Sequence, residues 1–443
     1  MFNDPKYCIE LKLTQQTPMI HFQAREGMSA GLGPRATEVK PKLDRFAALW
    51  YKRHNDKDLP DEWMVEFDEE RKKKGKKPEH SALNYVLRIT ASSKEPVVQK
   101  PDNNVKSVYF GNMGENTAKK LQIFNTGPVS LYIRCFIPGL KKLLEDCIET
   151  FFLIHNFGMR QDKGLGGFIP EGMTPGKAED LLRAWIGKDA VMVIDYSGCD
   201  LSQVGSADGG LLIGEIGTIY RILKSGLNIA NRDQKGPYIK SALTEYFLQE
   251  GGISGEKRAM KARGVAPHVY TRGDKSTHTQ GGKNGDRYIR GLFGYGQLQK
   301  WFSADQNDHM IPKIDEETGR IKKNKNRNIE YEKDTIKISP SKGTGIERIP
   351  SPLLFKIVGK CVFIIPHEIK VHGKLFEFSS IRYDRTIPAE PFQLEIPSEE
   401  EFNINDFMRW FIDWLDNKRR TVTYLPPYIP HIFTDSNVVI RQL

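Results

Sequence analysis

A glycine-rich segment with basic side chains is the part of the sequence best suited to binding chemistry. Residues 155–168 read HNFGMRQDKGLGGF, in which Arg160 and Lys163 stand among Gly158, Gly164, Gly166 and Gly167. Because glycine has no Cβ, its backbone N–H groups can approach phosphate oxygens closely, and the two cations add opposite charge. The alternative is a tight helix-to-strand turn that needs glycine only for its geometry. The segment lacks the P-loop pattern, and its glycines follow a helix, which argues against a Rossmann nucleotide site.

A strand followed by a basic helix occurs twice along the chain. An apolar strand at 9–13 leads to a basic segment at 35–46, and a second strand at 190–194 leads to another at 236–247. Apolar positions recur at helical spacing in both basic segments, and Pro41 is expected in the first turn of the first helix. The repetition of a whole strand-and-helix unit indicates two like domains in tandem.

The net charge favours a polyanionic partner. Lys and Arg number 66 against 56 Asp and Glu in 443 residues, which gives a net charge of +10. The segment 251–300 holds ten Lys or Arg and three Asp or Glu, and we interpret much of it as a long loop; 71–77 and 320–327 are two further basic tracts. Each tract alone could be a solvated loop, but three on one chain favour a phosphate backbone.

The cysteines and the hydropathy pattern bound the class of protein. Five scattered cysteines with no CxxC pair argue against zinc and against a disulfide framework. No apolar run approaches about 20 residues, the length of a membrane span, and the N-terminus has no signal-peptide pattern. We therefore expect a cytoplasmic protein with no membrane contact, no metal site and no cofactor.

Strand and helix patterns alternate, which predicts an α+β fold. Period-two alternation predicts strands at 84–90 and 129–137, and helical spacing predicts a helix at 140–152. A long strand or hairpin is expected at 353–365 and a further helix at 406–415. The face of the second strand that carries Tyr132, Arg134 and Phe136 could stack RNA bases, but packing against a second layer uses the same pattern and is preferred.

These motifs together resemble the RAMP superfamily, the RNA-binding subunits of CRISPR effector complexes. The glycine segment is similar to the glycine-rich loop of that family, and the two basic helices are similar to its second signature. Aromatic-Phe-Gly turns at 108–111 and 290–294 add a third element. Two units in one chain of this size are most similar to the first subunit of the type III-B (Cmr) complex. No good second copy of the glycine loop is found; 205–217 and 291–296 are candidates for degenerate versions.

The resemblance implies an architecture. It predicts two tandem ferredoxin-like domains at 1–188 and 189–443, with a long basic insertion around 251–348 in the second. It also implies guide (crRNA) and target RNA and other RAMP subunits as partners. Base pairing would read the sequence while the protein holds the backbone.

The resemblance further implies a set of side chains and backbone positions that contact phosphates. The expected RNA-binding residues are Arg35, Lys40, Lys42, Arg45, Gly158, Arg160, Lys163, Gly164, Gly166, Gly167, Lys240 and Arg290. The alternative for Lys40 and Arg45 is a solvated helix face with Glu38 and Asp44 as ion-pair partners.

A non-catalytic subunit is the preferred interpretation. Some RAMP proteins cleave RNA, so a guide-processing endoribonuclease with histidine acid–base chemistry is the alternative. Its candidate groups are His21, His155, His268 and His278, with Asp162 as a carboxylate in the glycine segment. A general base must lie within hydrogen-bond reach of the proton it takes, and the sequence does not bring any two of these groups together.

Overall fold

The structure is a computed structural model. The residues it describes are 4–17, 19, 33–65, 82–91, 97–99, 123–125, 129–187, 190–199, 208–228, 238–260, 263, 284–294, 296–303, 309–324, 327–343, 345–346, 349–381, 390–421 and 431–443. Helices and antiparallel sheets are mixed along the chain, as predicted for the α+β class.

The first half is a four-stranded antiparallel sheet with two helices on one face. In chain order its elements are β1 (Cys8–Gln15), α1 (Ala36–Asn55), β2 (Val86–Ala91), β5 (Val129–Arg134), α4 (Pro138–Leu153) and β6 (Phe168–Pro170). The strands lie in the order β2-β5-β1-β6. On β5, Val129, Leu131 and Ile133 are buried because alternate residues of a strand point to the same face. These three side chains share one core with the apolar faces of α1 and α4.

The second half repeats this connectivity. Its elements are β7 (Met192–Asp195), α6 (Asp208–Lys224), β14 (Leu353–Val358), β15 (Cys361–Pro366), α9 (Ile404–Thr421) and β18 (Val439–Gln442). The strands lie in the order β14-β15-β7-β18, which matches the order of the first sheet strand for strand. Both halves therefore run strand, helix, strand, strand, helix, strand.

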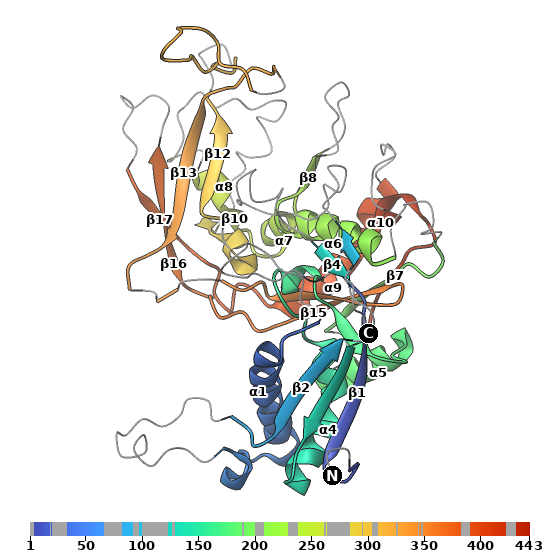
Figure 1. The fold of residues 1–443 in the computed structure, drawn as a ribbon. Coiled ribbons are helices and arrows are strands. Elements are labelled where there is room, and N and C mark those ends of the chain that lie inside the picture. Colours follow the sequence, from blue (N-terminus) through green and yellow to red (C-terminus); the bar gives the residue numbers. More distant parts are fainter. Residues whose placement is uncertain are drawn as a thin grey trace.

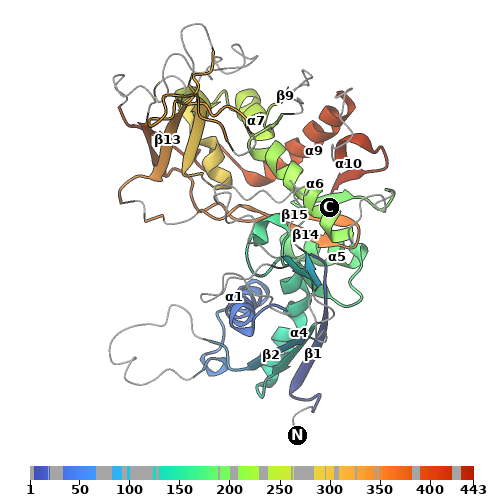
Figure 2. The same ribbon diagram turned by 45° about the horizontal axis from the view of Figure 1, so that its top comes forward.

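The second sheet has both faces buried, because the first half packs on one face and the rest of the second half packs on the other. On β15, Val362 and Ile364 belong to the core of the second half, whereas Phe363 and Ile365 belong to the core of the first. A strand covered on both faces becomes a continuous apolar run, which explains the sequence of 353–365. Figures 1 and 2 show β15 at the junction, with α1 and β1 on one side and α6 on the other.

A third sheet is assembled from two separate insertions. It contains β12 (Leu298–Phe302), β13 (Lys333–Pro340), β16 (Leu375–Ile381) and β17 (Phe392–Glu395), in that spatial order. The first two strands lie between α6 and β14 in the chain, and the last two lie between β15 and α9. The inner face of the sheet, with Ile336 and Phe378, joins the core of the second half.

Shorter elements complete the chain. They are η1 (Asp61–Trp63), β3 (Val97–Gln99), β4 (Ile123–Asn125), η2 (Gln161–Lys163), α5 (Pro175–Ile186), β8 (Leu227–Asn228), β9 (Tyr238–Ile239), α7 (Ala242–Glu250), β10 (Ser254–Gly255), α8 (Glu256–Ala259), β11 (Asp286–Arg287), η5 (Ile289–Phe293) and α10 (His431–Thr434).

Four expectations about local structure are corrected. The helix that follows β7 is α6, so Asp208–Lys224 is helical and no degenerate glycine loop. The segment expected as a basic helix that matches α1 forms α7, which holds no Lys or Arg and is a later, additional helix. Pro41 lies inside α1 beyond its first turn, since that helix begins at Ala36. The fourth is corrected in part: the described parts of 251–300 form short strands and helical turns rather than a loop, while 261–262, 264–283 and 295 lie outside the described residues.

The outer face of the first sheet is also a correction. Packing against a second layer was preferred for it, yet the side chains of Tyr132 and Phe136 are 38% and 66% exposed. The basic tract 71–77 and the turn at 108–111 lie outside the described residues. No helix in the described ranges is both long and apolar enough to cross a membrane.

Candidate nucleic-acid interface

The glycine segment lies at the junction of the two halves, between α4 and β6. Leu165 at its tip inserts into the core of the second half. A Cβ on Gly164 would lie 2.8 Å from Cδ1 of Ile216 on α6, and a Cβ on Gly166 would lie 1.7 Å from the carbonyl oxygen of Phe157. Both glycines have positive φ, 82° and 69°. Close packing and a left-handed backbone therefore require glycine at these two positions.

The second part of the segment has little backbone to offer a ligand. Gly164, Gly166 and Gly167 are buried. The Thr17 hydroxyl donates to the Gly164 carbonyl at 2.6 Å and accepts from the Gly167 N–H at 2.8 Å. A phosphate could approach only the half-buried first part, Gly158 to Lys163.

The first part of the segment is tied to α1 by a polar network. The Gly158 N–H donates to the Glu38 carboxylate at 3.0 Å, and Gln161 Nε2 donates to the same oxygen at 3.0 Å. Lys42 Nζ pairs with Glu38 at 3.0 Å and donates to Gln161 Oε1 at 2.7 Å. Two predicted RNA-binding residues, Lys42 and Gly158, are thus joined through one carboxylate.

The other basic residues of the first unit divide into two kinds. Lys40 Nζ pairs with Asp44 at 3.0 Å, donates to the Leu83 carbonyl at 2.8 Å and lies 4.0 Å from the centre of the Tyr85 ring. These contacts hold α1 to the chain just before β2. Arg35, at the N-cap of α1, and Arg45 are both exposed. Of the four predicted basic residues on and beside α1 (Arg35, Lys40, Lys42 and Arg45), only Arg35 and Arg45 present their side chains largely to solvent.

A buried lysine fixes the base of the glycine segment to the central sheet. Lys356 on β14 is 0% exposed, and its Nζ donates to the His155 carbonyl at 2.9 Å, to Asn156 Oδ1 at 3.0 Å and to the Phe168 carbonyl at 2.9 Å. Burial lowers the pKa of Lys356 well below its ordinary value. Lys356 was not predicted as a site residue from the sequence, because a single lysine in an apolar run does not indicate its partners.

Lys163 of the glycine segment contacts the second half, close to Lys224 and Arg290. Lys163 Nζ lies 4.4 Å from the centre of the Tyr220 ring on α6. Burial first, and then the nearby Arg160 guanidinium, lower the pKa of Lys163 to about 8. Lys224, at the end of α6, donates to the Phe293 carbonyl at 3.0 Å. Its pKa is lowered to about 7 by burial first and then by Arg290 and Lys163.

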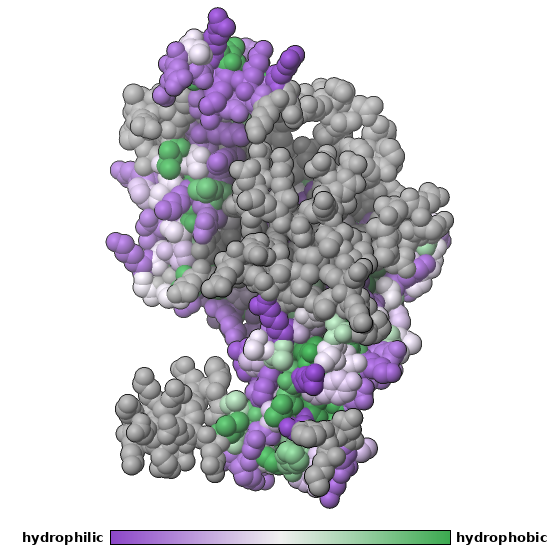
Figure 3. Space-filling model, viewed as in Figure 1, coloured by the Kyte–Doolittle hydropathy of each residue, from purple (hydrophilic) through white to green (hydrophobic). Residues whose placement is uncertain are grey.

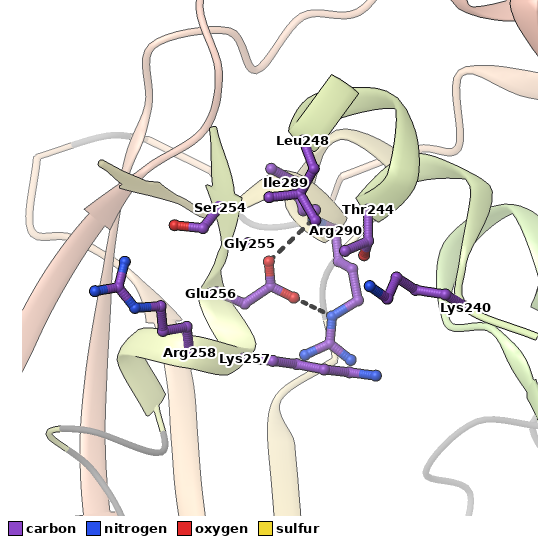
Figure 4. A pocket seen from close by; sticks show the side chains of 10 residues that line it. All are labelled: Lys240, Thr244, Leu248, Ser254, Gly255, Glu256, Lys257, Arg258, Ile289 and Arg290. Atoms are coloured by element: carbon purple, nitrogen blue, oxygen red, sulfur yellow. Dashed lines mark hydrogen bonds and ion pairs between the residues drawn. The ribbon is translucent and has the colours of Figure 1, made fainter. Parts of the chain in front are cut away.

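Lys240 and Arg290, predicted separately, meet in one pocket (Figure 4). Its lining residues are Lys240, Thr244, Leu248, Ser254, Gly255, Glu256, Lys257, Arg258, Ile289 and Arg290. Four of these are cations and one is an acid. The pocket lies beside the N-terminus of α7, where the Ser241 hydroxyl accepts from the Thr244 N–H. The partial positive charge of that helix end adds to the cations.

The acid of the pocket is held by Arg290. Glu256 has a side chain 1% exposed and forms an ion pair with the Arg290 guanidinium. Arg258 Nη1 lies 3.6 Å from Asp286 Oδ1, and Asp286 is not one of the residues that line the pocket. Lys240 comes from the chain just before α7 and extends toward Arg290 (Figure 4). The pocket therefore has more positive than negative charge and suits an anion.

The histidine that lies beside the glycine segment is packed among rings. His155 has its ring centre 4.5 Å from that of Phe151, and its Nδ1 lies 3.0 Å from the Phe151 carbonyl oxygen. Burial lowers the pKa of His155 to about 3, so the ring is neutral near pH 7. His21, His268 and His278 lie outside the described residues. Within the described ranges, no three His, Cys, Asp or Glu side chains gather as a metal site would require.

Comparison with known families matches almost the whole chain. The model of the Cmr1 N-terminal domain matches residues 6–227, and that of the Cmr1 C-terminal domain matches residues 238–425. A search of curated proteins finds no match. Among solved structures, the chain is similar to the apo form of Cmr1 from Pyrococcus furiosus, with 11% identity, a TM-score of 0.28, and 48% of this chain and 71% of that one covered.

Proposed function

The chain belongs to the Cmr1 family of RAMP subunits of the Cmr (type III) CRISPR complex, and on that premise we propose that it holds RNA by its backbone phosphates. The RNA would be the guide, its duplex with a target RNA, or both. The neighbours would be other RAMP subunits of the complex. The role proposed is binding without catalysis.

The pocket beside α7 carries this proposal. It gathers Lys240, Lys257, Arg258 and Arg290 at a helix N-terminus, from segments that lie far apart in the sequence. Cations and a helix N-terminus together favour a phosphate group, whose charge they neutralise without reading a base. Arg35, at the N-cap of α1, and Arg45, within it, are both exposed and are proposed as phosphate contacts of the first half.

The residues of the glycine segment are proposed in a more limited role. Gly164, Gly166 and Gly167 are buried and contribute packing, so the contacts assigned to this segment come from Arg160 and Lys163. Lys40 and Lys42 already have carboxylate partners, and their contribution to RNA binding would be indirect, through the position of α1.

A domain architecture belongs to the same proposal. The shared connectivity of the two halves supports two tandem ferredoxin-like domains, with the boundary near 188–189. The third sheet and the pocket would be additions of the second domain; strands β12 and β13 and most of the pocket lining come from 251–348, and β16 and β17 come from the later insertion. The endoribonuclease alternative gains no support from His155, whose low pKa makes it a poor acid near pH 7.

Salt-dependent binding of the full chain to single-stranded RNA tests the proposal. Lys240→Gln with Lys257→Gln removes two cations from the pocket and keeps Arg290 with its partner Glu256. Each lost phosphate contact reduces the slope of log affinity against log salt by about 0.7 for single strands, so the double variant should lose about 1.4. Lys52→Gln with Lys142→Gln makes the same charge change on exposed side chains of α1 and α4. Equal slopes in the two double variants would refute the pocket as a phosphate site.

A further inference from the structure

The outer face of the first sheet exposes aromatic side chains at its centre. Tyr132 lies on β5, an interior strand, and is 38% exposed, while Phe136 just beyond that strand is 66% exposed. The ring of Tyr7 lies 5.3 Å from that of Phe136, centre to centre. Figure 3 shows hydrophobic residues among hydrophilic ones over this part of the molecule, where Figure 1 draws β1 and β2.

Basic side chains surround these rings. Tyr132 pairs in register with Arg88 on β2 and with Glu10 on β1, so Glu10 is the one acid directly opposite it. Lys12, two positions after Glu10 on β1, is exposed. The guanidinium of Arg134 lies 5.8 Å from the centre of the Phe136 ring. Positive charge therefore exceeds negative charge around the aromatic centre.

Protein packing within the described chain does not account for this surface. The helices α1 and α4 pack on the opposite face, where Val129, Leu131 and Ile133 are buried. The rings face solvent, although full burial of one Phe side chain contributes a free energy of about 1.5–3 kcal/mol. An exposed ring flanked by cations suits a partner that has flat π faces and negative charge.

We propose that this sheet face binds single-stranded RNA, with bases stacked on Tyr132 and Phe136 and phosphates beside Arg88 and Lys12. A four-stranded sheet that stacks two or three bases on its aromatic residues is a known mode of RNA recognition. The inference rests on the proposed function and extends it to unpaired bases, because a base within a duplex has no free face for a ring.

Fluorescence anisotropy of the full chain with single-stranded RNA tests the inference. Tyr132→Leu and Phe136→Leu keep apolar bulk but remove the rings, and each should weaken binding by about 5-fold to 150-fold, the worth of one stacked base. Tyr132→Phe keeps the ring and should bind as the wild type does. Phe302→Leu, at a 40% exposed phenylalanine of the third sheet, is the matched control and should bind unchanged.

The outcomes separate this inference from the proposed function. Unchanged affinity in both leucine variants, together with weakened binding in the Lys240→Gln and Lys257→Gln double variant, would overturn only the RNA-binding role of the sheet face. The exposed rings would then be assigned to contact with a protein neighbour. Equal losses in Phe302→Leu would overturn that role too, because the effect would then not be local. Failure of the wild-type chain to bind RNA would overturn both. Loss in the leucine variants with recovery in Tyr132→Phe is the supporting result.

Discussion

Replacement of Lys356 by methionine should destabilise the junction between the two halves. Methionine preserves most of the side-chain volume but leaves three buried acceptors, on His155, Asn156 and Phe168, without their donor. Each buried acceptor left unsatisfied costs about 1–3 kcal/mol, and the removal of a desolvated amino group offsets part of that, so we expect a loss of about 3–5 kcal/mol.

Thermal unfolding measures this loss. For a unit of 150–250 residues, each kcal/mol changes Tm by about 2–4 °C, so the Lys356→Met variant should melt about 10 °C lower. Lys360→Met, in the adjoining turn of the same hairpin, is the control and should change stability by no more than about 0.5 kcal/mol. Melting of Lys356→Met within a degree of the wild type would refute the bridging role of Lys356.

The pH dependence gives a second readout for the same residue. Because burial lowers the pKa of Lys356, the unfolded chain binds a proton that the folded chain does not, between the folded pKa and about 10.4. Its contribution to the stability of the folded chain therefore rises with pH across that window. The methionine variant should lose this contribution, and an unchanged slope of Tm against pH would contradict the argument.

Three further predictions concern the junction and the pocket. Gly166→Ala should lower Tm by several degrees more than Gly172→Ala, because both have positive φ but only the first would place a Cβ against backbone; equal melting would contradict this. Arg290→Leu should cost about 3–5 kcal/mol in chemical denaturation, because Glu256 stays buried without its partner, and less when combined with Glu256→Leu. RNA affinity should fall between pH 7 and 9 as Lys163 loses its proton, and Lys163→Arg should remove that part of the fall.

Local periodicity predicted most elements of the first half. The alternation around Leu131 and the helical spacing from Leu140 gave β5 and α4, because one face of each is buried and the other is not. The hairpin at 353–365 was found as an apolar run. Its burial between two cores could not be foreseen, since a run covered on both faces has the same composition whatever covers it.

The site was predicted less completely, for reasons of distance along the chain. Lys240 and Arg290 were selected one by one, and only the fold brings them together with Lys257. The glycines were read as places where backbone could approach phosphate, whereas Gly164 and Gly166 allow the approach of Ile216 and of the Phe157 carbonyl. Glycine permits close contact with any neighbour, so a glycine pattern alone does not name the neighbour.

The sheet between the two halves has a consequence for synthesis of the protein. Part of the first core is supplied by residues that leave the ribosome late, among them Leu354 and Phe363. At about 5–20 residues per second, the ribosome needs many seconds to pass from β6 to β15. During that interval the part of the first core that Leu354 and Phe363 later cover is exposed to solvent, as apolar surface of the kind that chaperones bind. The first half thus becomes a finished domain only when the second is nearly complete.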